Sequence, residues 1–231
     1  MQKITSAAHY IKRLIAEGEH QQLDFKFAIT DSRKIAKTLV AFANTDGGTL
    51  LIGVKDNGNI AGIRSDEEYY MVEAAATMYC KPRVNFSTKK WTVEGKAVLE
   101  VLVEKSTEAP HFAEAEPKKL SAYIRIADEN ILANNVLIKV WKRQHHPKGV
   151  FIEFSEIEKN LLRYLENNDE VSLSKFCKIT MISKNMAENI LANLIYLDVI
   201  EIFYHEQHFL YRRKPASKNA PEPSRLSGLV V

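Results

Sequence analysis

Cysteine is scarce in this sequence, which has two cysteines, Cys80 and Cys177, among its 231 residues. They lie about a hundred residues apart, which is not the spacing of paired metal ligands. We therefore expect neither a disulfide framework nor a cysteine-based zinc site. We expect a reducing, cytoplasmic location.

Long apolar runs are also absent. No stretch approaches the roughly 18 apolar residues that a membrane-spanning helix needs. The opening segment "MQKITSAAHYIKRLIAEGEH" lacks the apolar core of a signal peptide and instead shows the spacing of an amphipathic helix. We therefore expect no membrane partner.

Familiar nucleotide-binding and catalytic motifs are missing as well. The sequence has no Walker-type phosphate loop, no dinucleotide fingerprint and no nucleophile elbow. ATP hydrolysis by a familiar mechanism is not expected. The net charge of +3 is mildly basic, and the positive surplus lies in residues 1–150. That charge permits a nucleic-acid partner without requiring one.

Helical and strand patterns alternate irregularly over residues 1–146, which predicts a mixed α/β domain instead of a doubly wound parallel one. "TLLIGV", after the turn "NTDGG", indicates a strand buried on both faces. Helices are predicted over 5–16, 31–43, 65–79 and 127–143, and strands over 23–27, 49–54, 84–93, 96–103 and 121–126, with a looser segment over 106–119.

A different organisation follows the proposed linker "QHHPKG" at 144–149. Three helical stretches with serine caps lead into two β-rich runs around His205–Gln207, which is the pattern of a winged helix-turn-helix over 150–214. Residues 215–231 are rich in Pro, Ser and Ala and are predicted to form a disordered tail.

The stretch "EHQQLDFKF" (Glu19–Phe27) carries the first candidate site. Leu23, Phe25 and Phe27 would form one buried strand face, so Asp24 and Lys26 would share the other. One interpretation is a solvated face with a surface ion pair. The other is a site that holds a divalent cation and phosphate, with Glu19 as a second carboxylate.

A longer motif, "AFANTDGGTLLIGVKDNGNIAGI", joins a helix end, a Gly-Gly turn, a strand and an acidic hairpin at Asp56. With "EHQQLDFK" and "AYIRIADENILA", it resembles the Schlafen-type AlbA-like domain, described as DNA-binding or divergent ATP-binding. The resemblance covers about residues 5–140. It implies nucleic-acid binding, and members of the family often carry a C-terminal winged helix.

Nuclease-active relatives imply a three-carboxylate ribonuclease site at Glu19, Asp24 and Asp56, with Lys26 assisting and Mg²⁺ or Mn²⁺ as the metal. Asp24 stands where Glu is more usual, which shortens the reach of the carboxylate. The resemblance also matches Arg125 to a family arginine, either a phosphate contact or a partner in a sheet-edge ion pair.

Further nucleic-acid contacts are proposed from the residues themselves. Lys89, Lys90 and Trp91 combine positive charge with an aromatic face suited to unpaired bases, the alternative being a solvated hairpin. In the winged part, the expected recognition helix presents Lys184 and Asn185, with Arg212 and Arg213 beyond the wing. The alternative for that part is a dimerisation or domain-packing module.

We therefore expect an α+β protein, a mixed-sheet Schlafen/AlbA-like domain followed by a winged helix-turn-helix domain. The leading hypothesis is a homodimeric, transcriptional-regulator-like protein that binds DNA or RNA and needs no cofactor for binding. The alternatives are a metal-dependent endoribonuclease and a protein-binding adaptor.

Overall fold

The structure of the protein, a computed structural model, describes residues 7–145, 155–215 and 229–230. The chain divides into two compact units, Met1–Ala133 and Asn134–Val231, and each is described by itself. Within the described ranges, no helix has the length and apolar character that crossing a membrane requires. The architecture is α+β with mixed and antiparallel sheets, as the sequence predicted.

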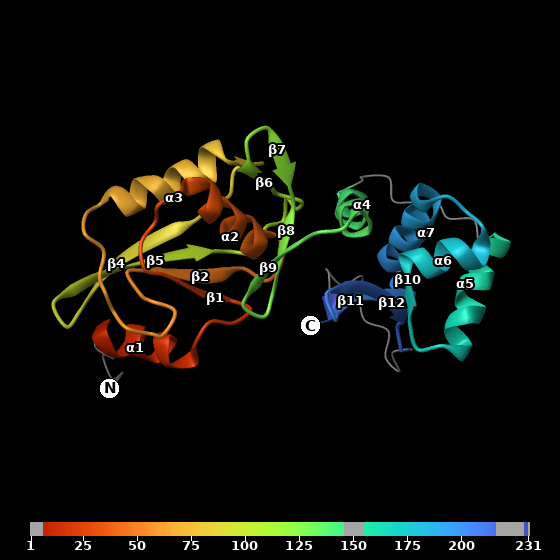
Figure 1. The fold of residues 1–231 in the computed structure, drawn as a ribbon, viewed down its shortest axis with the longest axis horizontal. Helices are drawn as coiled ribbons and strands as arrows, with labels where there is room; N and C mark the ends of the chain where they lie inside the picture. The colour runs from red at the N-terminus through yellow and green to blue at the C-terminus, as the bar shows by residue number, and fades with distance from the viewer. Residues whose placement is uncertain (1–6, 146–154, 216–228, 231) are drawn as a thin grey trace. The chain divides into compact units, whose positions relative to one another are not determined.

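The elements of the first unit are α1 (Ala7–Glu17), β1 (Leu23–Lys26), α2 (Ser32–Asn44), β2 (Gly48–Ile52), α3 (Glu67–Met78), β3 (Cys80–Lys81), β4 (Ser87–Val93), β5 (Lys96–Val103), β6 (Phe112–Glu116), β7 (Lys119–Ser121), β8 (Tyr123–Ile126) and β9 (Glu129–Leu132). Its main sheet has the order β1-β2-β5-β4 (Figure 1). β1 and β2 are parallel, whereas β5 is antiparallel to both of its neighbours. Two smaller sheets, β3-β6-β7 and β8-β9, complete the unit.

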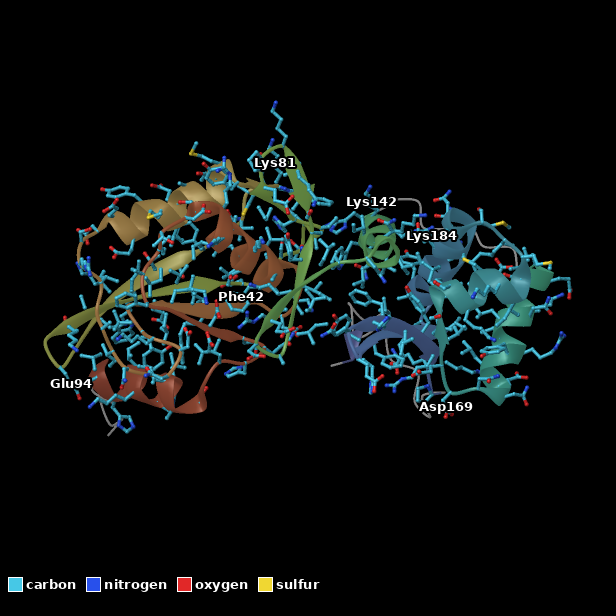
Figure 2. The ribbon with its side chains drawn as sticks, in the orientation of Figure 1. Phe42, Lys81, Glu94, Lys142, Asp169 and Lys184 are labelled. Atoms are coloured by element: carbon cyan, nitrogen blue, oxygen red, sulfur yellow. The ribbon has the colours of Figure 1, made fainter. Side chains whose placement is uncertain are left out.

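Helices cover both faces of the main sheet (Figure 1). On one face, Phe42 of α2 packs into a core with Leu50 of β2 (Phe42 is labelled in Figure 2). On the other face, Ile11 of α1 packs against Phe25 and Leu51. Because both faces are buried, β2 is the continuous apolar run that the sequence indicated.

The turn between α2 and β2 is tight because it contains a residue with left-handed backbone geometry. Asp31 caps the start of α2 by accepting a hydrogen bond from the Arg33 amide. At the other end, the Gly47 amide donates to the Phe42 carbonyl, and Gly47 has a φ of +73°. A glycine in this conformation ends a helix without the steric penalty of a side chain.

The helix predicted over 127–143 is wrong in its first part. Ala127 has a positive φ of 51° in the turn that joins β8 to β9, so the chain reverses there instead of coiling. A helix begins only after Asn134, whose side chain caps it by accepting from the Leu137 amide. The segment at 106–119, expected to be loose, contains β6 and the first residue of β7.

The elements of the second unit are α4 (Asn135–Gln144), α5 (Glu156–Asn167), β10 (Val171–Ser172), α6 (Leu173–Thr180), α7 (Lys184–Tyr196), β11 (Ile200–His205), β12 (His208–Arg213) and β13 (Leu229–Val230). Helices α5, α6 and α7 precede the antiparallel pair β11 and β12, which confirms the winged arrangement. Ser155 and Glu158 form a capping box at the start of α5.

The two units divide before α4, whereas the helix predicted over 127–143 fell within the predicted first domain, 1–146. The proposed linker at 144–149 begins with the last residue of α4 and a described His145, and its other residues lie outside the described ranges. The proposed disordered tail also lies mostly outside them. Within it, Leu229–Val230 form β13, which pairs in parallel with β11.

Candidate functional site

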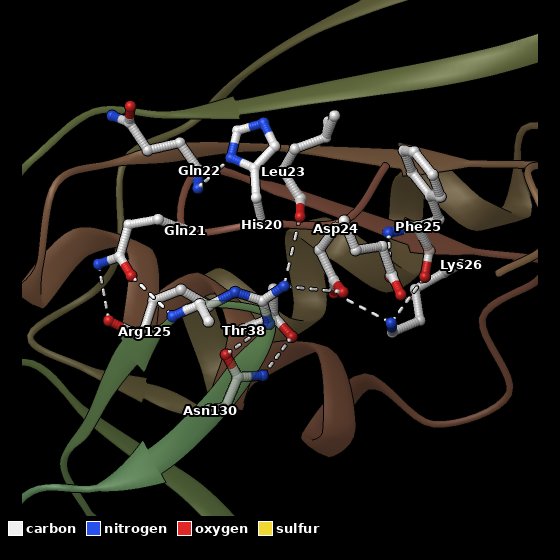
Figure 3. Close-up of polar contacts among 12 residues, drawn as sticks. His20, Gln21, Gln22, Leu23, Asp24, Phe25, Lys26, Thr38, Arg125 and Asn130 are labelled. Atoms are coloured by element: carbon white, nitrogen blue, oxygen red, sulfur yellow. Dashed lines mark hydrogen bonds and ion pairs between the residues drawn. The ribbon is translucent and has the colours of Figure 1, made fainter. Parts of the chain in front are cut away.

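Asp24 and Arg125 form an ion pair beneath α2, in place of the solvated strand face considered from the sequence. Arg125 Nη2 lies 3.2 Å from Asp24 Oδ1, and the two residues are 1% and 3% exposed. The guanidinium also donates to the Leu23 carbonyl and to Asn130 of β9, as Figure 3 shows. Its carbon lies 5.4 Å from the centre of the Phe42 ring. Arg125 is therefore enclosed, which contradicts its assignment as a phosphate contact and favours the ion-pair alternative.

Lys26 and Glu19 complete this charged cluster. Lys26 Nζ lies 3.0 Å from Asp24 Oδ2 and donates to the Phe25 carbonyl. Glu19 accepts a hydrogen bond from the Phe25 amide at 2.8 Å. Burial, and next a hydrogen bond with the Asp24 side chain, raises the pKa of Glu19.

Other polar residues of the two motifs join distant segments to one another. Gln21 donates to the Arg125 carbonyl and accepts from the Ala127 amide, so it clamps the β8–β9 turn. Thr45 accepts from the Arg125 amide. These bonds fix the backbone of the β8–β9 hairpin, so polar residues are needed at these positions for the fold alone.

Asp56 is exposed in the turn that follows β2, whereas Asp24 is buried within β1. Among the described residues, no three His, Cys, Asp or Glu side chains are placed so that they could hold a metal ion. Both Asp24 oxygens instead face cations of the chain itself. The structure therefore does not bring the proposed carboxylate trio together.

A hollow of the first unit lies beside α1, on the sheet face that α1 covers. It has a volume of about 460 Å³. Its lining comes from three elements: Tyr10 of α1, Lys89 and Trp91 of β4, and Glu100 and Leu102 of β5. Lys89 and Trp91 were proposed from the sequence, whereas Tyr10, Glu100 and Leu102 were not.

Glu100 organises this cavity. The Tyr10 hydroxyl donates to Glu100 Oε1 at 2.7 Å, and Trp91 Nε1 donates to Oε2 at 2.6 Å. Burial, and then the bond with Glu100, raises the pKa of Tyr10 to about 12, so the phenol stays a donor at neutral pH. The sequence offered one signal for Glu100: it is the single charged residue within the apolar run "AVLEVLV" of β5.

The basic residues of β4 differ in their surroundings. Lys89 Nζ lies 3.8 Å from the centre of the Trp91 ring, a cation–π contact. Lys90 forms an exposed ion pair with Asp66 at 2.9 Å. No ion pair among the described residues involves Lys89, so its charge, unlike that of Lys90, is available for an external anion.

In the second unit, α7 is a central helix and not a protruding recognition helix. Its buried residues form one broad face: Ala187, Glu188, Ile190, Leu191, Ala192, Leu194 and Ile195. Glu188 is 4% exposed and pairs with Lys139 of α4 at 3.1 Å. Arg143 of α4 donates to Asn193 of α7. α4 therefore covers the face of α7 that carries Glu188 and Asn193.

The remaining basic residues of the second unit lie at its surface. Lys184, labelled in Figure 2, is exposed in the first turn of α7. Asn185 is exposed there too but accepts a hydrogen bond from Lys139 at 2.7 Å. At the wing, Arg212 pairs with Glu201 at 2.5 Å, and Arg213 pairs with Glu166 at 3.3 Å. These acidic partners neutralise the arginines that were proposed as phosphate contacts.

The Arg212 pair is expected to stabilise the second unit. Replacing Arg212 with alanine leaves the Glu201 carboxylate, 8% exposed, without its partner. We expect the free energy of unfolding of this unit to fall by about 1–3 kcal/mol. The matched Arg213→Ala change should cost less than about 0.5 kcal/mol, because that pair is half exposed on both sides. Urea denaturation monitored by amide hydrogen exchange would measure the loss of stability in each variant. Equal losses would show that the Arg212–Glu201 pair stabilises the unit no more than the exposed Arg213–Glu166 pair.

Together, these features define a two-unit α+β protein whose first unit is held by a buried ion pair and whose second unit is winged-helix-like. A family model described as Schlafen, AlbA_2 matches residues 19–134, half of the chain. The chain belongs to this family. A model described as PCI domain matches residues 153–203 of the second unit. The resemblance stated from the sequence is thereby confirmed.

Two solved structures are similar to the chain. The DIP2311 protein from Corynebacterium diphtheriae shares 14% identity with a TM-score of 0.47, over 90% of this chain and 50% of that one. The chain thus spans about half the length of that protein. The second structure is the N-terminal domain of a protein related to the ATP-dependent DNA helicase RecG, from Nitrosomonas europaea. It shares 21% identity with a TM-score of 0.39, over 56% of this chain and 95% of that one. No curated protein matches the chain.

Proposed function

We propose that the first unit binds nucleic acid through the surface around Lys89 and that the protein acts as a regulator of gene expression. Membership of the Schlafen, AlbA_2 family supports the class of ligand. The observation that carries the location is Lys89, whose ammonium lies over Trp91 beside a cavity and pairs with no carboxylate among the described residues. A cation next to an aromatic face is the combination that binds single-stranded nucleic acid.

The second unit has a different part in this proposal. The covered face of α7 and the neutralised arginines of the wing leave few groups for a phosphate backbone. We assign phosphate binding to the first unit. The homodimer and the transcriptional role expected from the sequence stay predictions.

The ribonuclease alternative also stays a prediction. No observation favours it, because the Asp24 carboxylate faces Arg125 and Lys26 and Glu19 has a raised pKa. Incubation of the purified protein with structured RNA and Mg²⁺ or Mn²⁺ would test it. Cleavage by the unmodified protein that is lost in both Glu19→Gln and Asp56→Ala would support the ribonuclease hypothesis.

The binding proposal predicts a salt-dependent complex. In mobility-shift and anisotropy assays, the protein should bind single-stranded RNA or DNA, and the logarithm of affinity should fall linearly with that of salt concentration. Lys89→Ala should weaken binding and lower the salt slope by about one unit. Lys34→Ala is the matched control, because Lys34 is an exposed lysine of α2, which covers the other face of the sheet. Failure of the protein to bind either nucleic acid at low salt would refute the proposal.

A further inference from the structure

The cavity beside α1 has the size and the mixed lining of a small-ligand site. Its volume of about 460 Å³ lies within the range of such sites, about 300–1,000 Å³. Apolar surface is contributed by Trp91 and by Leu102, which is 43% exposed although it lies on a sheet strand. Ser87 adds a hydroxyl group. A flat, partly apolar group with polar edges therefore matches this lining.

The floor of the cavity has spare capacity to accept hydrogen bonds. Glu100 is 9% exposed, and no ion pair among the described residues includes it. Its two oxygens accept one hydrogen bond each from Tyr10 and Trp91. An ionised carboxylate offers about four acceptor sites. A ligand that brings N–H donors to Glu100 would use the sites that the protein leaves open.

The rim of the cavity provides a cation at a fixed distance from this acceptor. Lys89 and Glu100 are directly opposite one another in the β4–β5 pairing, so their charges lie on the same sheet face. A ligand that matches both must carry an anion close to a donor edge and a flat ring. A nucleotide with an exocyclic amino group has all three features. Acidic side chains accept hydrogen bonds from the amino group of cytosine in nucleic-acid complexes.

We propose that this cavity receives one unpaired, amino-bearing base of a single-stranded nucleic acid. The amino group donates to Glu100, and the adjacent phosphate contacts Lys89. The base must be unpaired, because pairing in a duplex occupies its amino group and keeps it within the stack. Uracil presents a carbonyl oxygen where cytosine presents its amino group, and the Glu100 carboxylate repels that oxygen. The inference rests on the proposed function and adds the part of the nucleic acid that is recognised.

Cytosine and uracil homopolymers test this directly, because their backbones are the same. At pH 7.5 and fixed salt, the full-length protein should bind oligo(C) RNA more tightly than oligo(U) RNA of equal length, by on the order of tenfold. Glu100→Gln should abolish the preference, because the amide no longer repels the uracil carbonyl. Circular dichroism would verify that the variant is folded.

A second variant keeps the test independent of the Glu100 hydrogen bonds. Leu102→Trp places a large side chain at the exposed edge of the cavity and leaves the charge unchanged, so affinity for oligo(C) should fall to that for oligo(U). Leu120→Trp is the matched control, because Leu120 is similarly exposed, at 45%, on β7 in another sheet. It should retain the preference.

The outcomes separate the cavity from the proposed function. Equal binding of both homopolymers by the unmodified protein, or a preference that survives Leu102→Trp, would overturn the base site and leave nucleic-acid binding standing. Binding of neither homopolymer would overturn both.

Discussion

Replacing Asp24 with alanine is expected to lower the free energy of unfolding of the first unit by about 3–5 kcal/mol. The change leaves the Arg125 guanidinium, which is 1% exposed, without its carboxylate partner. A buried, uncompensated charge is among the few causes of so large a loss from one substitution. Denaturant titration, with hydrogen exchange resolved by peptide, would assign the loss to the first unit.

Two further variants make this expectation specific. Asp56→Ala removes an exposed aspartate of the first unit and should change stability by no more than about 0.5 kcal/mol. Combining Asp24→Ala with Arg125→Met removes both charges, and the double variant should be more stable than the two separate losses predict. Strictly additive losses, or a near-neutral Asp24→Ala, would show that the pair does not hold the fold.

Gly47→Ala is expected to destabilise the first unit by about 2–5 kcal/mol. Gly47 has a φ of +73°, and a Cβ there would lie 2.7 Å from the Val103 carbonyl oxygen and 2.9 Å from the Lys105 amide nitrogen. Both are backbone atoms, at the end of β5 and just after it, so neither can rotate away. Thermal and urea denaturation of the purified variant would measure the loss.

Gly95 provides the matched comparison. Its φ is +76°, but a Cβ built there would have nothing within 4 Å. Gly95→Ala should therefore show the backbone cost alone, about 1–2 kcal/mol. The difference between the two variants measures the contact of the α2–β2 turn with the chain after β5. If the two losses were equal, that close approach would contribute nothing.

Much of the fold was predictable from local patterns. The alternation and turn residues of β4 and β5 predicted a hairpin, and the apolar run of β2 predicted a strand buried on both faces. The helix predicted over 127–143 was wrong in its first part because the sequence "ADENIL" is also compatible with a helix. In the structure, residues Glu129–Leu132 pair with β8 and form strand β9. Tertiary pairing of this kind overrides propensity.

The candidate site was less predictable, because its contacts join residues far apart in the sequence. The motifs pointed to Asp24 and Arg125, but each was interpreted without its partner, which lies 101 residues away. Tyr10 and Glu100 are separated by 90 residues and were missed altogether. For α7, a signal was present: its apolar residues form a broad face from Ala187 to Ile195, which indicates a helix packed against several neighbours.

Because α4 packs against α7, the boundary chosen between fragments of this protein affects whether each fragment can be expressed. A fragment that ends at residue 146 would contain α4 but not Glu188, with which Lys139 of α4 forms an ion pair. In that fragment, Val140 and Trp141, both buried in the intact chain, would lose the residues that they pack against. The complementary piece, beginning at 150, would lose the same helix. Division between Ala133 and Asn134 keeps each apolar face with its cover, so boundary choice alone can decide between a soluble fragment and an aggregating one.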